Sequence, residues 1–244
     1  MKKLIIALCI LTFIGCGKKE ESKTDTTPDN TPAHLTETQT YYFGMILSGS
    51  ERSQSNEEAA EIQKAHLANI GRLADEGLMA LAGPFWNEDN SNKIRGLFIY
   101  EVDSIEQAQE LVDTDPAVQK NRLAVDVYPW IGSKNMTYTE PVEMRGYQAA
   151  IFWNNSNDIP LFNDIYTYFH KQLALLSDSA SIVLAGPFDS EGMNIEGKTP
   201  HSIFIFSVDT TATISDFASK SKWLSDSLLT VDVLNFYGPV GLKE

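Results

Sequence analysis

The residue best placed for acid–base chemistry is His66, because it interrupts the apolar side of a helix that the sequence predicts over residues 56–76. At about 100° per residue, this apolar side extends over about 80° from Ile62 to Ile70, and His66 lies in its middle. A buried imidazole needs a hydrogen-bond partner, because an unsatisfied polar group costs free energy. A carboxylate partner would hold one ring nitrogen as a donor and leave the other free to take a proton. The alternative is a core histidine that is hydrogen-bonded to backbone or water.

Asp115 is followed by Pro116, directly after a second predicted helix over residues 104–113. Proline disfavours helical geometry in the residue before it, and aspartate is common in turns. The dipeptide therefore has a purely structural explanation, in which it ends one helix and begins a turn. A chemical role for the carboxylate is the other interpretation, and it depends on what lies beside Asp115 in the fold.

The folded part of the chain contains an internal repeat. The sequence Leu-Ala-Gly-Pro-Phe occurs over residues 81–85 and again over residues 184–188. Apolar positions before and after this sequence also recur in the same order, with a short insertion in the loop that follows the second Gly-Pro. Self-similarity at a fixed period is the sequence signature of duplicated structural units. We therefore predict two copies, over residues 41–140 and 141–244, and expect each Gly-Pro pair to end a strand.

Each copy has the same predicted order, strand–helix–strand–strand–helix–strand. Apolar residues at helical or alternating spacing mark the elements, and a serine precedes each helix of the first copy. In the first copy they cover residues 42–47, 56–76, 78–82, 95–102, 104–113 and 122–130; in the second, 147–153, 160–176, 182–185, 202–208, 214–223 and 228–236. This order is ferredoxin-like. Because one such unit leaves a sheet face uncovered, we predict an α+β fold in which two ferredoxin-like βαββαβ repeats form an intramolecular dimeric α+β barrel.

The first copy resembles the YCII-related family, whose fold is the dimeric α+β barrel. The resemblance covers about residues 41–135 and is carried by three motifs: His66-Leu67, Leu-Ala-Gly-Pro at residues 81–84, and Asp115-Pro116. It implies that His66 and Asp115 form an acid/base pair. It also implies chemistry on small, often aromatic compounds, because some relatives are lyases or isomerase-like enzymes. The second copy is similar in pattern only, over about residues 145–240.

The second copy departs from this pattern at the two positions of the proposed acid/base pair. In the alignment of the two copies, Phe169 stands where His66 stands, and Ser221 stands where Asp115 stands. His170 follows Phe169, at the edge of the apolar side, and a small shift of the helix would be needed to bring it into the same role. We therefore predict a single site on the first copy, with the second copy as a lid and packing partner.

The N-terminus has the layout of a secretion signal. Lys2 and Lys3 precede an apolar run over residues 4–14, which is shorter than the roughly 20 residues that span a membrane. The run ends at Gly15-Cys16, which resembles the bacterial lipobox. The resemblance implies a signal peptide over residues 1–15, lipidation of Cys16 and anchoring to the cell envelope, with the outer membrane as the expected site. Residues 16–40 are polar and are predicted to be a disordered tether.

Charge and composition narrow the classes of partner. The net charge is −14, and loss of Lys2 and Lys3 with the signal would make it −16. Such a surface repels phosphate backbones, so we expect no nucleic-acid partner. The cysteines are Cys9, in the signal, and Cys16, so the mature chain has no disulfide. The histidines lack metal-ligand spacing and no glycine-rich phosphate loop is present, so we expect neither a metal nor a cofactor.

Two functions remain open on these grounds. The loss of the His/Asp pair from the second copy favours a membrane-anchored protein that binds a small molecule or acts as an accessory protein. The alternative is a lyase or isomerase that acts on a small organic compound, with His66 as the general base and Asp115 orienting it. A hydrogen bond between the two side chains beside an open cavity would favour the enzyme, whereas widely separated side chains would favour the binding protein.

Overall fold

The computed structural model describes residues 31–86, 93–176, 180–189 and 198–244. The predicted signal peptide (1–15), Cys16 and the first part of the tether lie outside the described residues. The first half consists of β1 (Thr38–Ser48), α1 (Asn56–Asp75), β2 (Met79–Trp86), β3 (Ile94–Tyr100), α2 (Ile105–Asp113), α3 (Pro116–Gln119) and β4 (Leu123–Ser133). The second consists of β5 (Met144–Asn154), α4 (Phe162–Leu173), β6 (Ser181–Pro187), β7 (Thr199–Ser207), α5 (Thr211–Ser219), α6 (Lys222–Ser225) and β8 (Leu229–Pro239). In the described part of the chain, every helix is too short or too polar to cross a membrane.

The helices of the first half begin where their capping residues predict. The side chain of Ser55 accepts a hydrogen bond from the backbone N–H of Glu58, and Ser104 does the same for Gln107. Each bond satisfies one of the N–H groups that a helix leaves free at its start. The short helix α3 was not expected from the sequence, although an aspartate before a proline at the first helical position is a signal for a helix start.

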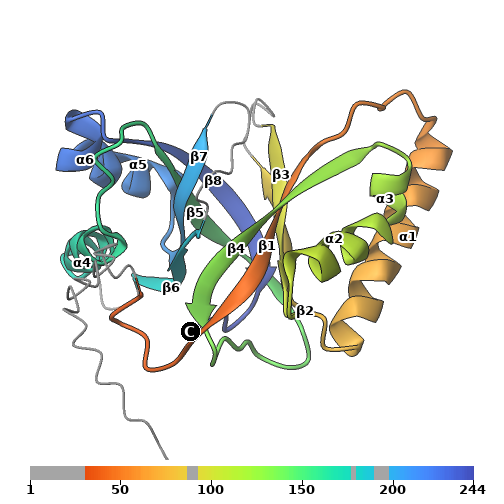
Figure 1. Cartoon of the computed structure of the whole chain (residues 1–244), viewed down its shortest axis with the longest axis horizontal. Coiled ribbons are helices and arrows are strands. Elements are labelled where there is room, and N and C mark those ends of the chain that lie inside the picture. Colours follow the sequence, from red (N-terminus) through yellow and green to blue (C-terminus); the bar gives the residue numbers. More distant parts are fainter. Residues whose placement is uncertain (1–30, 87–92, 177–179, 190–197) are drawn as a thin grey trace, which may run out of the picture.

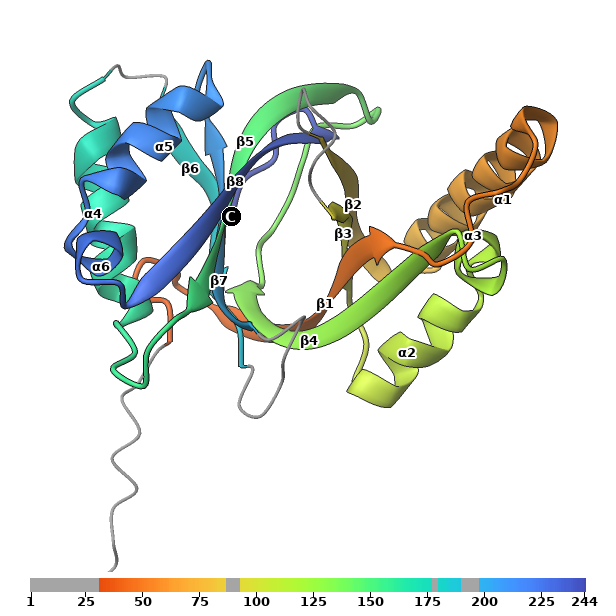
Figure 2. The same cartoon turned by 90° about the horizontal axis from the view of Figure 1, so that it is seen from above.

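All eight strands form one antiparallel sheet in the order β4-β1-β3-β2-β8-β5-β7-β6. The sheet curls until its two edge strands meet, at a bridge between Trp130 of β4 and Phe188, which directly follows β6 (Figure 2). The two halves also meet on the opposite side, where Phe85 of β2 pairs with Phe236 of β8. This bridge, with the hydrogen bond from the N–H of Asp189 to the carbonyl oxygen of Pro129, covers part of the edges that an open sheet presents. The prediction of an α+β barrel built from two ferredoxin-like repeats is confirmed.

The two halves use equivalent hydrogen bonds at equivalent places. The hydroxyl of Tyr41 donates to the carbonyl oxygen of Ser133 at 2.9 Å, and the hydroxyl of Tyr147 donates to that of Pro239 at 2.7 Å. All four residues lie on the first or last strand of their half, and both tyrosines are buried. A buried phenol needs such a partner. The barrel therefore has an approximate twofold relation between its halves.

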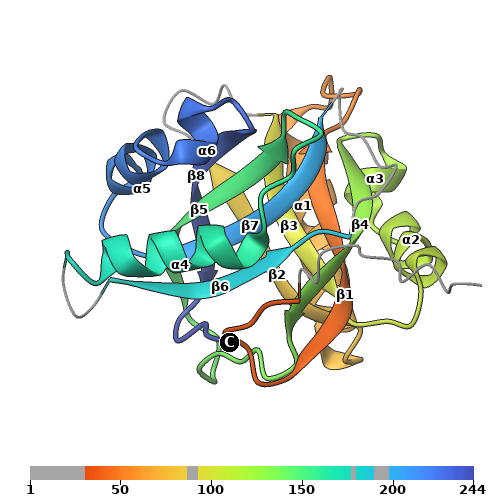
Figure 3. The ribbon, with the colours of Figure 1, turned by 60° about the vertical axis from the view of Figure 1, so that its left-hand side comes forward.

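Helices cover the outside of the barrel in two groups (Figure 1). Helices α1, α2 and α3 lie on the outer face of the first half, and α4, α5 and α6 lie on that of the second half; Figure 3 shows α4 in front of β6 and β7. Each group of helices packs on the sheet through its own hydrophobic core, and a third hydrophobic core lies inside the barrel. This inner core takes buried side chains from both halves, including Phe43, Leu97, Trp130, Ile151, Ile205 and Phe236. Burial of this apolar surface stabilises the contact between the halves.

Only one of the two Gly-Pro pairs ends its strand as expected: Gly186-Pro187 ends β6, whereas Gly83-Pro84 lies within β2. A Cβ atom on Gly83 would overlap the ring of Phe236, and one on Gly186 would overlap the ring of Trp130. In each case it would also overlap the carbonyl oxygen of the residue after that aromatic side chain. Glycine is required here because the strands of the two halves approach closely, not because the strand must turn.

Residues 31–40 of the predicted tether are part of the folded structure. The Nε2 atom of His34 lies 2.8 Å from Oε1 of Glu244, and the imidazole stacks on the ring of Tyr166 with centroids 3.7 Å apart. The backbone N–H of Ala33 donates to Oδ1 of Asn163 at 2.8 Å. Strand β1 also begins at Thr38, before the predicted boundary. The polar composition of this segment concealed these contacts, because they depend on partners far along the chain.

Candidate functional site

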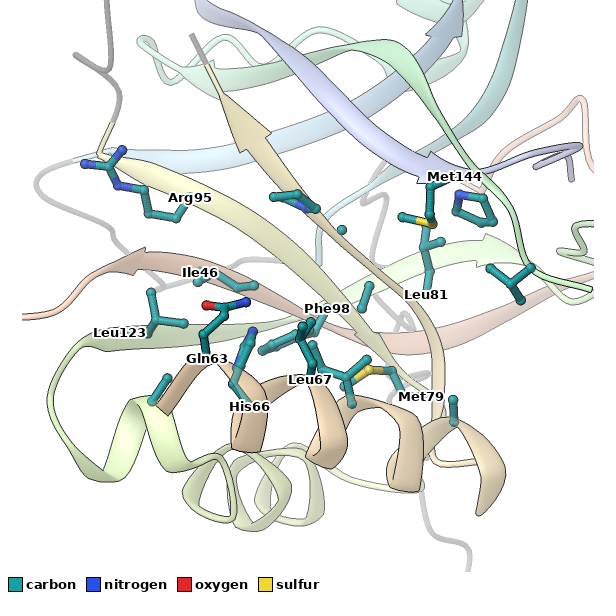
Figure 4. A pocket seen from close by; sticks show the side chains of 18 of the residues that line it. Ile46, Gln63, His66, Leu67, Met79, Leu81, Arg95, Phe98, Leu123 and Met144 are labelled. Carbon is teal, nitrogen blue, oxygen red and sulfur yellow. The ribbon is translucent and has the colours of Figure 1, made fainter. Parts of the chain in front are cut away.

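His66 lies on the side of α1 that faces the sheet, as its helical position predicted. It is 8% exposed, and its ring centroid lies 6.1 Å from that of Phe98 on β3. Figure 4 shows His66, Gln63 and Leu67 projecting from α1 toward the strands. The apolar residues Ile62 and Leu73, which share this side of the helix, are buried. Their packing fixes the helix against the sheet and so fixes the direction of the imidazole.

Asp115 lies beside this imidazole. Its Oδ2 atom is 2.7 Å from Nδ1 of His66, and its Oδ1 atom accepts a hydrogen bond from the backbone N–H of Ala117 at 2.8 Å. The residue is 2% exposed and caps α3, which begins at Pro116. Asp115 therefore lies between two helical segments, where it caps α3, and it is also the hydrogen-bond partner of His66.

This arrangement assigns different roles to the two ring nitrogens of His66. An ionised carboxylate only accepts hydrogen bonds, so a neutral imidazole in this contact carries its proton on Nδ1 and keeps the lone pair on Nε2. Burial raises the pKa of Tyr100, and the negative charge of Asp115 raises it further, so this neighbouring phenol stays neutral. The imidazole is thus oriented by a carboxylate, with one nitrogen left to exchange a proton with a ligand.

A cavity of about 590 Å³ opens beside His66 (Figure 4). This volume is within the range of sites that hold small organic molecules. Its lining is mostly apolar and comes from the first half; members include Ile46, Leu67, Ile70, Met79, Leu81 and Phe98. One wall is different in origin, because Tyr138 and Val142 come from the segment between the halves and Met144 and Pro239 come from the second half. The second half therefore helps to enclose the cavity, in line with the prediction that the second copy covers a site on the first.

Three arginines also line this cavity, and no motif in the sequence indicated them. Arg52 precedes α1, Arg95 lies on β3, and Arg122 precedes β4. Burial lowers the pKa of Arg52, and the positive charges of Arg122 and Arg95 lower it further. The three residues are far apart in the sequence and share no motif, so only the fold brings their charges together.

The second half has no equivalent pair. Phe169 is fully buried at the position that corresponds to His66, where its ring packs on Phe204 and Phe206. His170 is exposed, so it does not replace the missing imidazole. Ser221 corresponds to Asp115, and its hydroxyl is buried without a hydrogen-bond partner. In the described part of the chain, the His/Asp arrangement thus occurs in the first half alone.

Comparisons with known proteins identify the first half. Residues 42–131 match the YCII-related domain. Protein YciI of Escherichia coli O6:H1 and that of Shigella flexneri are each 31% identical to this chain over 94 residues, which are 36% of this chain and 91% of each relative. The chain belongs to the YCII-related family. His66 and Asp115 both lie within the YCII-related domain, whereas the wall formed by Tyr138, Val142, Met144 and Pro239 lies outside it.

A solved structure extends the likeness to both halves. A mutant chlorite dismutase from Candidatus Nitrospira defluvii, in complex with cyanide, is 10% identical to this chain, with a TM-score of 0.54. The alignment covers 86% of this chain and 92% of that chain. At this level of identity the likeness shows the fold alone, which places the YCII-related domain and the second half together in a dimeric α+β barrel.

Proposed function

We propose that this protein is an enzyme that acts on a small organic compound, with His66 as the general base and Asp115 as the residue that orients it. The observation that supports the proposal is the 2.7 Å contact between Asp115 and Nδ1 of His66 beside a cavity of about 590 Å³. A core histidine that only needed a partner would not require an adjacent cavity. The sequence favoured a binding or accessory role, but this geometry favours the catalytic alternative.

The arrangement suits reactions that move a proton to or from carbon. Nε2 of His66 removes a proton from the substrate, and the carboxylate of Asp115 stabilises the imidazolium that forms. Return of the proton to a neighbouring atom completes an isomerisation. Loss of a leaving group from the adjacent atom instead completes an elimination, which is the reaction of a lyase. One positioned base serves both, and the apolar lining of the cavity would hold an aromatic or aliphatic substrate.

A second candidate is a protein that binds a small molecule without changing it. The second half supports this candidate, because Phe169 and Ser221 occupy the places that His66 and Asp115 hold in the first half. A barrel that has lost one site could use the other for binding alone. The cavity and its lining are the same in both proposals, so they differ only in whether the bound molecule reacts.

We extend the proposal to the second half and to the N-terminal segment of the chain. We infer that the two halves are tandem YCII-related copies, which the repeated Leu-Ala-Gly-Pro-Phe sequence and the equivalent tyrosine hydrogen bonds support. We also infer that Cys16 carries lipid and holds the barrel at the cell envelope, on the outer membrane and facing either the periplasm or the cell exterior. The site would then act on small molecules in that compartment.

Hydrogen exchange at carbon tests the enzymatic proposal without knowledge of the product. Small aromatic and carbonyl compounds are incubated with the chain in D₂O, and loss of C–H signals is followed by NMR. We expect at least one compound to exchange with the wild type and none to exchange with His66→Gln. If a compound bound in the cavity but never exchanged or reacted, the binding function would replace the catalytic one.

A further inference from the structure

The charge of the cavity is opposite to that of the chain. The chain has 33 Asp and Glu residues against 19 Lys and Arg, and its net charge is −14. Yet three of its five arginines, Arg52, Arg95 and Arg122, line the cavity, and no carboxylate is among the lining residues that the structure describes. A random surface of this protein would be acidic, so the cavity is selectively basic.

The arginines are held by neutral groups. Nε of Arg95 donates to Oγ of Ser48 at 2.7 Å, and Nη1 of Arg122 donates to Oε1 of Gln54 at 2.8 Å. Nη1 of Arg52 lies 3.3 Å from the backbone carbonyl oxygen of Arg122. In the described segments, no ion pair joins any of the three to a carboxylate. Within the described segments, these bonds fix the guanidinium groups without a carboxylate that compensates their positive charges.

Three positive charges at one cavity repel one another. This repulsion adds to burial in lowering the pKa of Arg52, which is the direction expected for cations held close together. A bound anion would relieve the repulsion and accept hydrogen bonds from the guanidinium donors that remain free. Arginine is well suited to this task, because its planar donors match the oxygens of a carboxylate or a phosphate group.

We propose that the cavity binds a small organic acid whose oxyanion, a carboxylate or a phosphate, lies among Arg52, Arg95 and Arg122. Its apolar body then lies along Leu67 and Phe98, next to His66. Figure 4 shows Arg95 at one end of the cavity and Met144 at the other, with His66 between them. The inference rests on the proposed function and deepens it, because it names the class of molecule that the site takes. The arginines are positioning residues, and His66 is the group that exchanges the proton.

Binding of three matched probes to the whole chain tests this inference. Phenylacetate and phenyl phosphate carry an oxyanion on an aromatic body, and phenylacetamide is the neutral counterpart. Probes of about 10 heavy atoms that fit a site bind with dissociation constants near 1 mM, which NMR titration measures. We expect both anions to bind. The neutral amide should bind at least about tenfold more weakly, because it cannot make the charge-assisted hydrogen bonds. Whichever anion binds more tightly identifies the oxyanion, carboxylate or phosphate.

Variants assign the effect to the arginines. Arg95→Gln and Arg122→Gln should each weaken anion binding about tenfold and leave the amide unchanged. Arg95→Lys should restore part of the affinity, because it keeps the charge and loses the planar donors. The matched control is Arg72→Gln, which removes the same charge from an exposed residue that pairs with Glu76 outside the cavity.

Three results would overturn the inference: no binding of either anion, equal binding of the amide, or an effect of Arg72→Gln as large as that of Arg95→Gln. Asp115→Asn separates this inference from the proposed function. Anion binding should survive that substitution, whereas exchange at carbon should not. If the wild type bound anions but catalysed no exchange at carbon, the proposed enzymatic function would be wrong and the proposed ligand class would stand. If only neutral compounds exchanged, the enzymatic function would stand and the ligand class would be wrong.

Discussion

Both oxygens of Asp115 lie within hydrogen-bond distance of Nδ1 of His66, and one of them also binds the backbone. Oδ2 is the nearer, at 2.7 Å from Nδ1, whereas Oδ1 lies 3.0 Å from Nδ1 and also accepts the N–H of Ala117 at 2.8 Å. Because the second bond caps α3, the carboxylate cannot turn away from the imidazole without loss of the cap. The orientation of the base is therefore tied to the local backbone, and substitutions at Asp115 have outcomes that depend on which oxygen they replace.

Asp115→Asn should reverse the tautomer of His66. In the variant, the amide oxygen would keep the cap, so the amide NH₂ would face Nδ1 and donate to it. The ring proton would then move to Nε2, and the base would lose its free lone pair. A comparable aspartate-to-asparagine change in the serine-protease triad lowers the rate about 10⁴-fold for this reason. Nitrogen-15 NMR of the imidazole reads the tautomer directly.

The control for this change is Asp113→Asn, at an exposed carboxylate two residues earlier. It removes the same charge and should leave both the tautomer and the activity as in the wild type. A proton that stays on Nδ1 in Asp115→Asn would mean that the amide has turned over and abandoned the cap. That result would contradict the assignment of the cap to one oxygen and of the nearer contact with Nδ1 to the other.

His66→Phe should destabilise the fold, because it leaves a buried carboxylate with one oxygen unpaired. Loss of one partner from a buried charged pair costs about 3–5 kcal/mol. In the second half, the uncharged residues Phe169 and Ser221 stand at these two positions. The double variant His66→Phe/Asp115→Ser should therefore recover most of the lost free energy of unfolding. Urea unfolding of the two single variants, the double variant and the wild type gives the coupling. Additive effects, within about 0.5 kcal/mol, would show that the two side chains do not interact.

Gly83→Ala and Gly186→Ala should each destabilise the barrel. The added Cβ overlaps a backbone carbonyl oxygen and an aromatic ring of the other half, and overpacking of this kind costs about 1–3 kcal/mol or more. The control is Gly71→Ala, on the exposed side of α1, where nothing lies within 4 Å of the new atom. It should stabilise the protein by about 0.8–1 kcal/mol through helix propensity. Thermal unfolding distinguishes the two outcomes, and equal tolerance at all three sites would contradict the close approach.

His201 should make the fold sensitive to mild acid. Burial lowers the pKa of His201, and its hydrogen bond to the carbonyl oxygen of Pro160 opposes this only in part. Below the unfolded value of about 6.5, the unfolded chain therefore binds more protons than the folded chain, and stability falls as the pH falls. His201→Gln should reduce this loss in urea unfolding across that range. The exposed His170→Gln is the control, and equal pH dependence in the His201 variant and the wild type would refute the assignment.

Two matched cysteine substitutions, one at Cys16 and one at Cys9, test the proposed lipidation of Cys16. Cys16→Ser should prevent attachment of the acyl chains, so the protein should leave the membrane fraction, since each buried methylene contributes about 0.8 kcal/mol to anchoring. Cys9→Ser should have no effect on the mature protein, because Cys9 would depart with the proposed signal peptide. Cell fractionation and mass spectrometry of the mature chain check both. An unmodified Cys16 in the wild type would exclude the anchor.

The sequence by itself was enough to predict the strands and the longer helices, the α+β barrel and the inward direction of His66. These depend on local features, namely apolar spacing, caps and a repeated segment, and each can be read within a few turns of one element. The predicted end of the strand was wrong at Gly83, because close approach between halves is not a local property. The segment before Thr38 differed for the same reason, since its partners Tyr166 and Glu244 lie in the second half.

Tertiary structure alone decided the composition of the site. The contact between His66 and Asp115 joins residues 49 positions apart, and the resemblance suggested it, but only the packing of α1 on α3 brings the two atoms to 2.7 Å. The grouping of Arg52, Arg95 and Arg122 had no sequence signal at all. Local periodicity fixes which way a side chain points along its own element. The distance between elements is set by how the whole sheet curls and closes, and that determines which charges share a cavity.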